Sequence, residues 1–545
     1  MKIGLTNIVS CKIGSTQVNR VYIGSTLIWS YSAFDPDAQL FITNAAITDP
    51  VQQNTVNNLV INLKNYGIWT KMKALYPFVG GTANQHKFNL RNPLDTDAAF
   101  RLVFNGGWTH SSTGSTPNGV NAFANTFYKP FANGLKDSAH ISYYSRTNVS
   151  AGGAIDMGSL TAAPGYYHHM HIRQPGDLMY GLLNTESAAA LSNSITQGLF
   201  IASRITSTTT SLYRNITNLG TVNLTSTATY PNLNIYIGAG NNVNVASQFS
   251  TKETAFNSIG DGLTDTEAAN YYTAVQTFQT TLNRQVGVPI VADADAQAFL
   301  NAAVIENVTQ ASAVNTLVTD LKGYGIWTKM KALYPFVGGT ASQHKFNLKN
   351  PLDTDAAFRL VFNGGWTHSS TGALPNGVNG FADTRLLPSA VQTLNSNSIG
   401  YYVRTLNTSA STDPVQMGVF EGGTQRSILH QLNNSATLAT ALNGTPILGT
   451  VSNATGLFTS SKTSSTITSI YKNNTLVSSG ASGGDLPQLY NILIGNMSIS
   501  ATAYGNGWVN NQFAFAFIGD GFNSTEQANL YTAVQAFQTT LGRQV

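Results

Sequence analysis

The eleven residues FNGGWTHSSTG occupy positions 104–114, and the same eleven letters recur at positions 362–372. The surrounding stretches, 67–114 and 325–372, are identical except at two positions, Asn84 against Ser342 and Arg91 against Lys349. A repeat of this length indicates duplicated architecture, and its limits set the domain organisation.

The repeat extends to the end of each copy. IGDGLTDTEAANYYTAVQTFQTTLNRQV at 259–286 matches IGDGFNSTEQANLYTAVQAFQTTLGRQV at 518–545, whereas the sequence between these anchors diverges. The chain is therefore a tandem duplication of one module of roughly 250 residues, a size that a single β domain can reach. We predict a head of residues 1–33, a first module of residues 34–287 and a second module of residues 288–545.

The composition excludes several classes of protein. Only 10% of the 545 residues are charged, the net charge is +4 and the basic residues form no cluster, so we expect no nucleic-acid partner. A single cysteine allows no intrachain disulfide, and no apolar run is long enough for a secretory signal or a membrane helix. We therefore expect assembly in a cytoplasm and no membrane insertion.

Each module is predicted to begin and end with a helix. Asp49 followed by Pro50 is typical of a helix start, and the apolar residues after it recur at helical spacing: Val56, Leu59, Val60 and Leu63. Near the end of the copy, Thr264 and Glu267 have the spacing of a capping box.

Short runs rich in β-branched and aromatic residues, bounded by Gly, Asn, Pro and Ser, fill the middle of each module. In the first copy these runs lie at 73–81, 86–93, 99–107, 139–147, 166–174, 198–206, 210–217 and 233–240. The pattern predicts a mainly β chain of tandem jelly-roll β-sandwiches with short flanking helices, preceded by a small β segment in the head.

The order of motifs late in each module is that of a known family. LYRNITNLG, IYIGAG and FNSIGDGLTDTEAANYYTAVQTFQ follow one another in the first copy, and IYKNNTLVSSG, ILIG and FAFIGDGFNSTEQANLYTAVQAFQ in the second. This order resembles concanavalin A-like, laminin-G-like jelly rolls, although both copies lack the glycine that usually follows the asparagine. The family spans lectins, adhesion modules and glycan hydrolases, so the resemblance does not choose an activity.

A second resemblance concerns the head and the repeated block. The head sequence CKIGSTQVNRVYIGSTLIWS is similar to the N-terminal docking segments of tailed-phage virion proteins. NLKNPLDTDAAFRLVFNGGWTHSSTG resembles structural proteins of phages that infect Bacteroidetes-type bacteria. These resemblances imply a virion protein, with other virion proteins as partners of residues 1–33 and a homo-oligomer as its state.

The repeated loop carries the residue types that bind sugars. Tryptophan offers a flat apolar face, and short polar side chains offer hydrogen bonds to hydroxyls. The candidate glycan site is Asn105, Trp108, His110 and Ser111, with Asn363, Trp366, His368 and Ser369 in the second copy. The alternative, which the sequence favours, is a glycine-bent strand with a core tryptophan.

Two groups are candidates for metal ligands. His169 and His171 share one face of a predicted strand, although a solvent-facing pair without metal is the favoured interpretation. Laminin-G-like modules often bind calcium, which makes calcium the one cofactor implied, with ligands at Asp95 and Asp97 and at Asp353 and Asp355. The alternative for these aspartates is ordinary turn and cap chemistry.

The leading hypothesis is a phage fibre-like component without enzymatic activity that attaches to a host-surface glycan or forms the particle exterior. The alternative is a polysaccharide-degrading enzyme on the same fold. Glycan-cleaving jelly rolls carry an E-x-D-x-x-E run, and this sequence has none. A third reading is a purely architectural protein without ligand.

Overall fold

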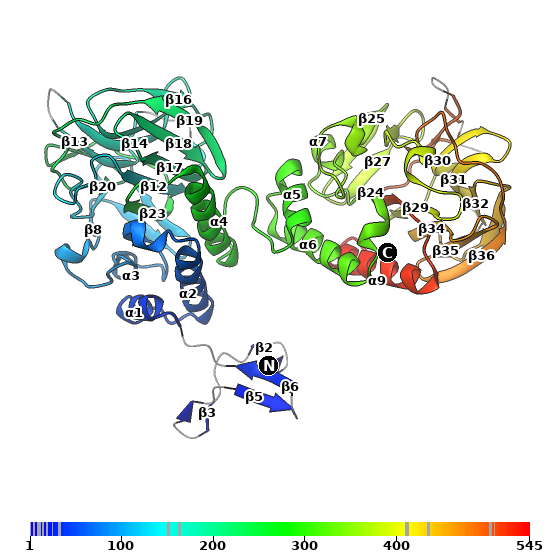
Figure 1. The fold of residues 1–545 in the computed structure, drawn as a ribbon, viewed down its shortest axis with the longest axis horizontal. Helices are drawn as coiled ribbons and strands as arrows, with labels where there is room; N and C mark the ends of the chain where they lie inside the picture. The colour runs from blue at the N-terminus through cyan, green and yellow to red at the C-terminus, as the bar shows by residue number, and fades with distance from the viewer. Residues whose placement is uncertain are drawn as a thin grey trace. The chain divides into compact units, whose positions relative to one another are not determined.

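The computed structural model describes residues 34–149, 153–161, 165–408, 414–432, 437–500, 504–505 and 507–545, and the backbone of short strands within residues 2–30. The chain divides into two compact units, residues 1–286 and 287–545 (Figure 1). The division falls one residue before the predicted module boundary. We call residues 34–286 module 1 and the second unit module 2.

Module 1 is a sandwich of two β-sheets. The strands of its first sheet are β7 (Met72–Tyr76), β9 (Trp108–Ser111), β10 (Gly114–Pro117), β12 (Ala139–Ser145), β17 (Gly198–Arg204), β18 (Thr209–Arg214), β19 (Thr217–Asn223) and β23 (Thr254–Gly260). They have the order β19-β18-β17-β12-β23-β10-β9, with β7 also on β23. This is the sheet that the helices cover.

The second sheet of module 1 lies on the other side of the sandwich. Its strands are β8 (Val103–Asn105), β11 (Phe123–Asn125), β13 (Met157–Leu160), β14 (Tyr167–Gln174), β15 (Leu178–Thr185), β16 (Ala190–Ser192), β20 (Tyr236–Ile237), β21 (Gly240–Asn242) and β22 (Val245–Ser247). The order is β16-β15-β14-β13-β20-β11-β8, and β21 joins β13 in parallel while the pairs along this order are antiparallel.

Module 2 repeats this plan. Its first sheet has β24 (Met330–Tyr334), β26 (Trp366–Ser369), β27 (Gly372–Pro375), β29 (Asn397–Val403), β34 (Gly456–Lys462), β35 (Ile467–Lys472), β36 (Thr475–Ala481) and β39 (Phe513–Gly519). Its second sheet has β25 (Val361–Asn363), β28 (Phe381–Asp383), β30 (Val415–Gly422), β31 (Gln425–Leu432), β32 (Thr437–Leu442), β33 (Ile447–Thr450), β37 (Leu493–Ile494) and β38 (Met497–Ser498). The predicted mainly β, jelly-roll class is confirmed.

Helices flank the strands at both ends of each module. Module 1 has α1 (Pro36–Asn44), α2 (Pro50–Asn65), α3 (Ala83–His86) and α4 (Asp265–Thr281), and module 2 has α5 (Ala294–Ala303), α6 (Val308–Gly323), α7 (Ala341–His344), α8 (Pro388–Val391) and α9 (Ser524–Thr540). The predicted caps are confirmed, since Asp49 accepts from the Gln52 amide at 2.8 Å and Thr264 forms a capping box with Glu267. Short 3-10 turns lie at Trp69–Lys71, Asp97–Ala99, Trp327–Lys329 and Asp355–Ala357.

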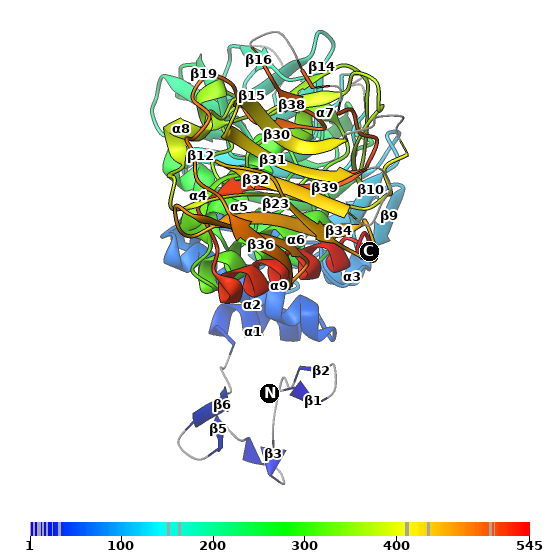
Figure 2. The same cartoon turned by 90° about the vertical axis from the view of Figure 1, so that its right-hand side faces the viewer.

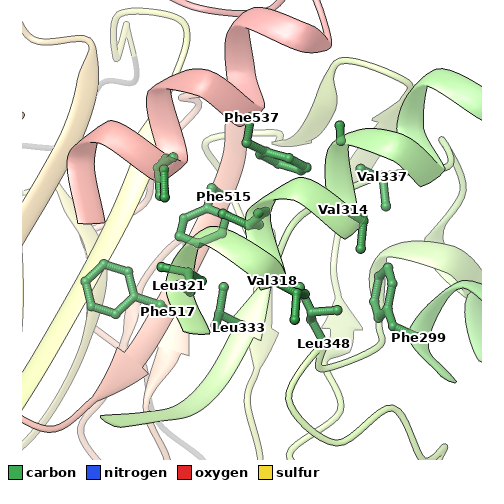
Figure 3. Close-up of a cluster of buried hydrophobic side chains, with 14 of the residues drawn as sticks. Phe299, Val314, Val318, Leu321, Leu333, Val337, Leu348, Phe515, Phe517 and Phe537 are labelled. Carbon is green, nitrogen blue, oxygen red and sulfur yellow. The ribbon is translucent and has the colours of Figure 1, made fainter. Parts of the chain in front are cut away.

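Module 2 buries two hydrophobic cores, one on each face of its first sheet. One fills the space between the sheets and includes Ile399, Tyr401 and Met417. The other lies beneath the helices, where α6 and α9 pack beside each other (Figures 1 and 2) and cover Phe515 and Phe517 (Figure 3). The apolar stripes predicted for these helices are therefore the faces that α6 and α9 bury against the first sheet.

A β-bulge in β39 directs some of the strand's aromatic side chains into one core and others into the second core. The register against β29 shifts between Tyr402 and Val403, which pair with Phe515 and Phe513. In a regular strand, side chains two residues apart lie on the same face of the sheet. The extra residue of a bulge places such side chains on opposite faces. Phe513 therefore enters the core between the sheets, whereas Phe515 enters the core beneath the helices.

A buried arginine after the last helix ties each module together. Arg284 is 1% exposed, and its guanidinium donates to Gln279 at 2.6 Å and to the carbonyls of Pro77, Phe78 and Ala255 at 2.6–3.2 Å. Arg543, 0% exposed, makes the same set of bonds to Gln538 and to the carbonyls of Pro335, Phe336 and Ala514. The interaction joins α4 or α9 to the end of the module's first strand.

Two sequence expectations need correction. Residues 86–93 form no strand but a turn closed by an Asn89–Asn92 bridge, in which the Asn89 side chain accepts from the Leu75 amide at 2.9 Å. The helices α1 and α5, which precede α2 and α6, were not expected, although each has an aspartate N-cap, Asp35 and Asp293. The turn has its own backbone bond from the Asn92 amide to the Asn89 carbonyl at 3.1 Å, and the Asn89 side chain fastens it to β7, an interaction that strand periodicity does not reveal.

Within the head, the described backbone forms three antiparallel strand pairs: β1 (Lys2–Ile3) with β2 (Thr6–Asn7), β3 (Lys12–Ile13) with β4 (Thr16–Gln17), and β5 (Arg20–Ile23) with β6 (Thr26–Ser30). The remaining residues of 1–33 lie outside the described residues, so its docking role stays a prediction. Across the described helices, none has the length and apolar character needed to cross a bilayer.

Replacing Arg543 by methionine tests the role of the buried guanidinium. The variant leaves buried carbonyls without donors, which we expect to destabilise module 2 by about 3 kcal/mol and to lower its Tm by roughly 6–12 °C. Calorimetry of the full chain measures this. Arg359→Met, at the surface of the same module, is the control and should leave the Tm nearly unchanged. Equal Tm values for both variants would contradict the role.

Candidate ligand-binding site

The predicted glycan residues of the repeated loop make their bonds within the protein. Trp108 is half-buried against the core between the sheets, and its ring lies 5.4 Å from the Phe104 ring in an edge-to-face arrangement. The indole also packs on the Gly238 backbone, where an added Cβ would lie 2.9 Å from it. The tryptophan face is therefore occupied by protein.

The polar candidate residues beside this tryptophan are also hydrogen-bonded within the protein. The Asn105 side chain donates to the Val103 carbonyl at 3.0 Å, and the Ser111 hydroxyl lies 2.8 Å from that of Thr113. In module 2, Asn363 and Ser369 make the equivalent bonds to Val361 and Thr371. This geometry favours the scaffold interpretation, and sugar binding by these residues stays a prediction.

A pair of histidines fixes the base of the loop. His86 accepts from the Gly81 amide at 3.2 Å through Nε2, so its Nδ1 carries the hydrogen, with Ser115 Oγ at 2.8 Å and His110 Nδ1 at 3.0 Å as its acceptors. Burial, with the neighbouring His110 as a smaller cause, lowers the pKa of His86 to about 3, and both rings are neutral at pH 7. His344 and His368 repeat the pair at 2.9 Å.

The predicted calcium ligands are paired with basic side chains. Asp95 contacts Lys87 at 2.7 Å and Arg101 at 2.9 Å, and Asp97 contacts Arg101 at 2.9 Å. Asp353 and Asp355 make the corresponding pairs in module 2. The described residues contain no group of three or more His, Cys, Asp or Glu side chains placed to hold a metal, and the calcium site stays a prediction.

The structure places His169 and His171 on the outer face of the second sheet of module 1, as the strand pattern predicts. Met170 and Ile172, which alternate with them on β14, enter the core between the sheets. The expected solvent exposure is wrong for His169, which is 4% exposed. The Tyr167 ring lies 5.4 Å from one side of it and the His171 ring lies 4.8 Å from the other.

These histidines line an open cavity of about 440 Å³. The cavity is lined by Ile155, Leu160, Tyr167, His169, His171, Gln174, Pro175, Tyr180, Leu182, Ala188 and Gln248, so it combines apolar walls with aromatic rings, imidazoles and amides. Its size lies in the range of roughly 300–1,000 Å³ that is typical of ligand pockets. None of the described lining residues carries a carboxylate, an ammonium or a guanidinium.

Both imidazoles in the cavity are neutral. Burial holds the pKa of His169 well below 6.5, and burial also lowers the pKa of His171. His171 Nδ1 lies 2.7 Å from the Ala154 carbonyl and also contacts the Gln174 side-chain amide; because the carbonyl can only accept, we assign the hydrogen to Nδ1, which makes Nε2 an acceptor. His169 Nδ1 is buried and has no hydrogen-bond partner in the described part of the protein. An unpaired buried nitrogen costs stability and commonly marks a functional position.

Strand pairing identifies the counterparts of these residues in module 2. Gly158 pairs with His169, and the equivalent Gly418 pairs with Ile428. His171 pairs with Tyr180 on β15, and His430 pairs with Ala439 on β32. Module 2 therefore has an apolar residue where module 1 has His169, and no aromatic ring at the position of Tyr180. Among the described residues, module 1 therefore has an imidazole and a phenol that module 2 lacks at the corresponding positions.

No family model matches the chain, and no curated protein matches its sequence. Solved structures with some likeness include the CBM40 module of the Ruminococcus gnavus IT-sialidase (12% identity, 25% of this chain and 82% of that chain, TM-score 0.21). Others are domain 4 of the Geobacillus stearothermophilus arabinanase AbnA in complex with arabinotriose (14%, 37% and 98%, 0.24) and mouse laminin alpha1 domains LG4-5 (9%, 71% and 81%, 0.20). Likenesses this weak carry no weight for function.

A matched substitution in both copies tests whether the loop tryptophans are structural. Trp366 Nε1 donates to the carbonyls of Asn363 and Phe381 at 3.1 and 3.2 Å, whereas Trp108 Nε1 is buried without a partner. We expect Trp366→Phe to destabilise its module by about 1 kcal/mol more than Trp108→Phe does. Calorimetric transitions of the full chain measure the difference. A stable Trp108→Phe variant that loses glycan binding would instead place the ligand site in the loop.

Proposed function

We propose that module 1 binds a neutral glycan in the cavity of His169. The observation that carries this proposal is a cavity that combines two neutral imidazoles, one of them with the acceptor nitrogen His171 Nε2, with phenols and amides, and whose described lining residues carry no charge. A ligand with hydroxyl groups satisfies such nitrogens at little cost, because it exchanges one set of hydrogen bonds for another.

The walls of the cavity match the two kinds of surface on a sugar ring. Tyr167 and Tyr180 provide aromatic surface for C–H groups, and Leu160 and Leu182 provide apolar surface beside them. His171 Nε2 is available as an acceptor, and the Gln174 amide, whose nitrogen already donates to the Ala154 carbonyl at 3.3 Å and contacts His171, offers its oxygen as a second acceptor. A charged ligand would lose its hydration there without a compensating ion pair.

Binding without cleavage fits the lining better than hydrolysis does. Glycosidases commonly use two carboxyl groups, one as acid and one as base or nucleophile. The carboxylate of Asp156, next to the lining residue Ile155, cannot serve as one of them, because it is 0% exposed. It accepts from Lys252 at 2.9 Å and from Ser250 at 2.7 Å. We therefore propose a binding protein rather than a polysaccharide-degrading enzyme.

We further propose that the chain is a fibre-like component of a tailed-phage virion that attaches to host-surface glycans. The support is the resemblance of the head and of the repeated block to virion proteins. Residues 1–33 would dock to other virion proteins, the modules would project outward, and the chain would assemble as a homo-oligomer without contacting nucleic acid.

Variants that install the module 2 residues test the glycan site. We expect the full chain to bind neutral sugars on a glycan array, and His169→Ile or Tyr180→Ala to weaken that binding about tenfold or more through lost hydrogen bonds and ring contact. Calorimetric titration with the best array ligand gives the Kd values. Ile428→Val, at the counterpart position in module 2, is the control. Unchanged affinity in both module 1 variants, with the fold intact, would refute the site.

Deleting residues 1–33 tests the virion role. We expect a phage encoding the truncated chain to form particles that lack it, because the head supplies the docking contacts. Mass spectrometry of purified particles measures incorporation, and the truncated protein should keep its glycan binding. Incorporation of the truncated chain at the parental level would show that the head does not dock it.

A further inference from the structure

Module 1 has a second cavity that shares no lining residue with the first. Its volume is about 370 Å³, and it lies where β7, the turn after α3 and the segment after β11 meet. The lining residues are Met72, Lys73, Arg91, Asn92, Phe100, Tyr128 and Asn133. Two cations, two amides and a phenol give this cavity a different chemistry from that of the uncharged one.

The uncompensated charge of the cavity comes from Arg91. Lys73 is paired with Asp261 at 2.9 Å, so its charge is balanced. Arg91 forms no ion pair with the described residues. Its Nε donates to the Met72 carbonyl at 3.1 Å, and its guanidinium stacks on the Trp69 ring at 4.4 Å. These contacts orient the guanidinium and leave its terminal nitrogens for a ligand.

A buried phenol adds a hydrogen-bond donor. Tyr128 is 0% exposed, its ring lies 4.8 Å from that of Phe100, and its hydroxyl has no hydrogen-bond partner among the described residues. Burial raises the pKa of Tyr128, so the hydroxyl keeps its hydrogen at neutral pH. The Tyr128 hydroxyl and the Arg91 guanidinium line the same cavity, and a negatively charged acceptor would satisfy both groups.

Module 2 lacks both of these groups. Leu386 occupies the position of Tyr128, since the amide of each bonds to the hydroxyl of the threonine two residues earlier, Thr126 or Thr384. Arg91 is replaced by Lys349, one of only two differences between residues 67–114 and 325–372. A lysine lacks the planar fork that engages two oxygens together. The repeated scaffold thus differs between copies at this cavity.

We infer that this cavity binds the carboxylate of a small acidic ligand. Arg91 is the charged anchor, its fork matching the two oxygens of a carboxylate, and Tyr128 donates a further hydrogen bond. Asn92 and Asn133 also line the cavity; the Asn133 amide nitrogen already donates to the Lys129 carbonyl at 2.8 Å, and its oxygen is an acceptor for a hydroxyl of the ligand. This site is independent of the neutral-glycan site and does not rest on it.

Titration of the full chain with galacturonate, galactose and inorganic phosphate tests the inference. We expect galacturonate to bind and galactose to leave its binding unaffected. Arg91→Lys and Tyr128→Phe, which keep the size and the ring, should each weaken galacturonate binding about tenfold, the typical effect of losing a hydrogen bond to a charged group. Lys349→Arg in module 2 is the matched control and should change nothing.

Three results would overturn the inference. Displacement of bound galacturonate by galactose as effectively as by further galacturonate would mean that the carboxylate is not recognised. Tighter binding of phosphate than of galacturonate would assign the cavity to a different anion. Parental galacturonate affinity in both Arg91→Lys and Tyr128→Phe, with parental Tm values to show that they fold, would place any binding elsewhere.

Discussion

A guanidinium without a carboxylate partner holds each module closed. Arg284 and Arg543 donate to main-chain carbonyls of two separate strands or turns and to a glutamine of the last helix. Burial lowers the pKa of both to about 9, which still leaves them charged at neutral pH. Because main-chain carbonyls accept these bonds, the neighbouring side chains can change while the closure stays. This constraint makes the helical layer, and hence the sandwich beneath it, tolerant of a diverging middle sequence.

That tolerance explains where the two copies differ. Side chains between the sheets must fill a shared volume, whereas side chains on the outer face of the second sheet contact fewer neighbours. His169 and Tyr180 stand on that outer face, and their counterparts are Ile428 and Ala439. Identity of the repeated block therefore reflects the scaffold, with the Arg91–Lys349 exchange as an exception, and the cavity of His169 lies among the strands that diverged.

Periodicity and caps predicted the fold class, both helix starts and the shared face of His169 and His171, because these are local properties. The role of Trp108 could not be read from sequence, since a core tryptophan and a sugar platform require the same residue. The burial of His169 was also missed, because the alternation of a strand does not show that the Tyr167 and His171 rings pack against this side chain or that Leu182 on β15 pairs with it. The bulge that places Phe513 and Phe515 in different cores could not be predicted either, because it depends on the pairing of β39 with β29.

The asymmetry between modules has a consequence for valency. A duplicated lectin is expected to present two equivalent sites per chain, so that one chain can bridge two sugars and gain avidity by itself. Among the described residues, module 2 has Ile428 and Ala439 in place of His169 and Tyr180, so under the proposed function each chain contributes a single arm for such a sugar. Under that proposal, multivalent attachment through the cavity of His169 comes from the number of chains in an assembly and not from the duplication.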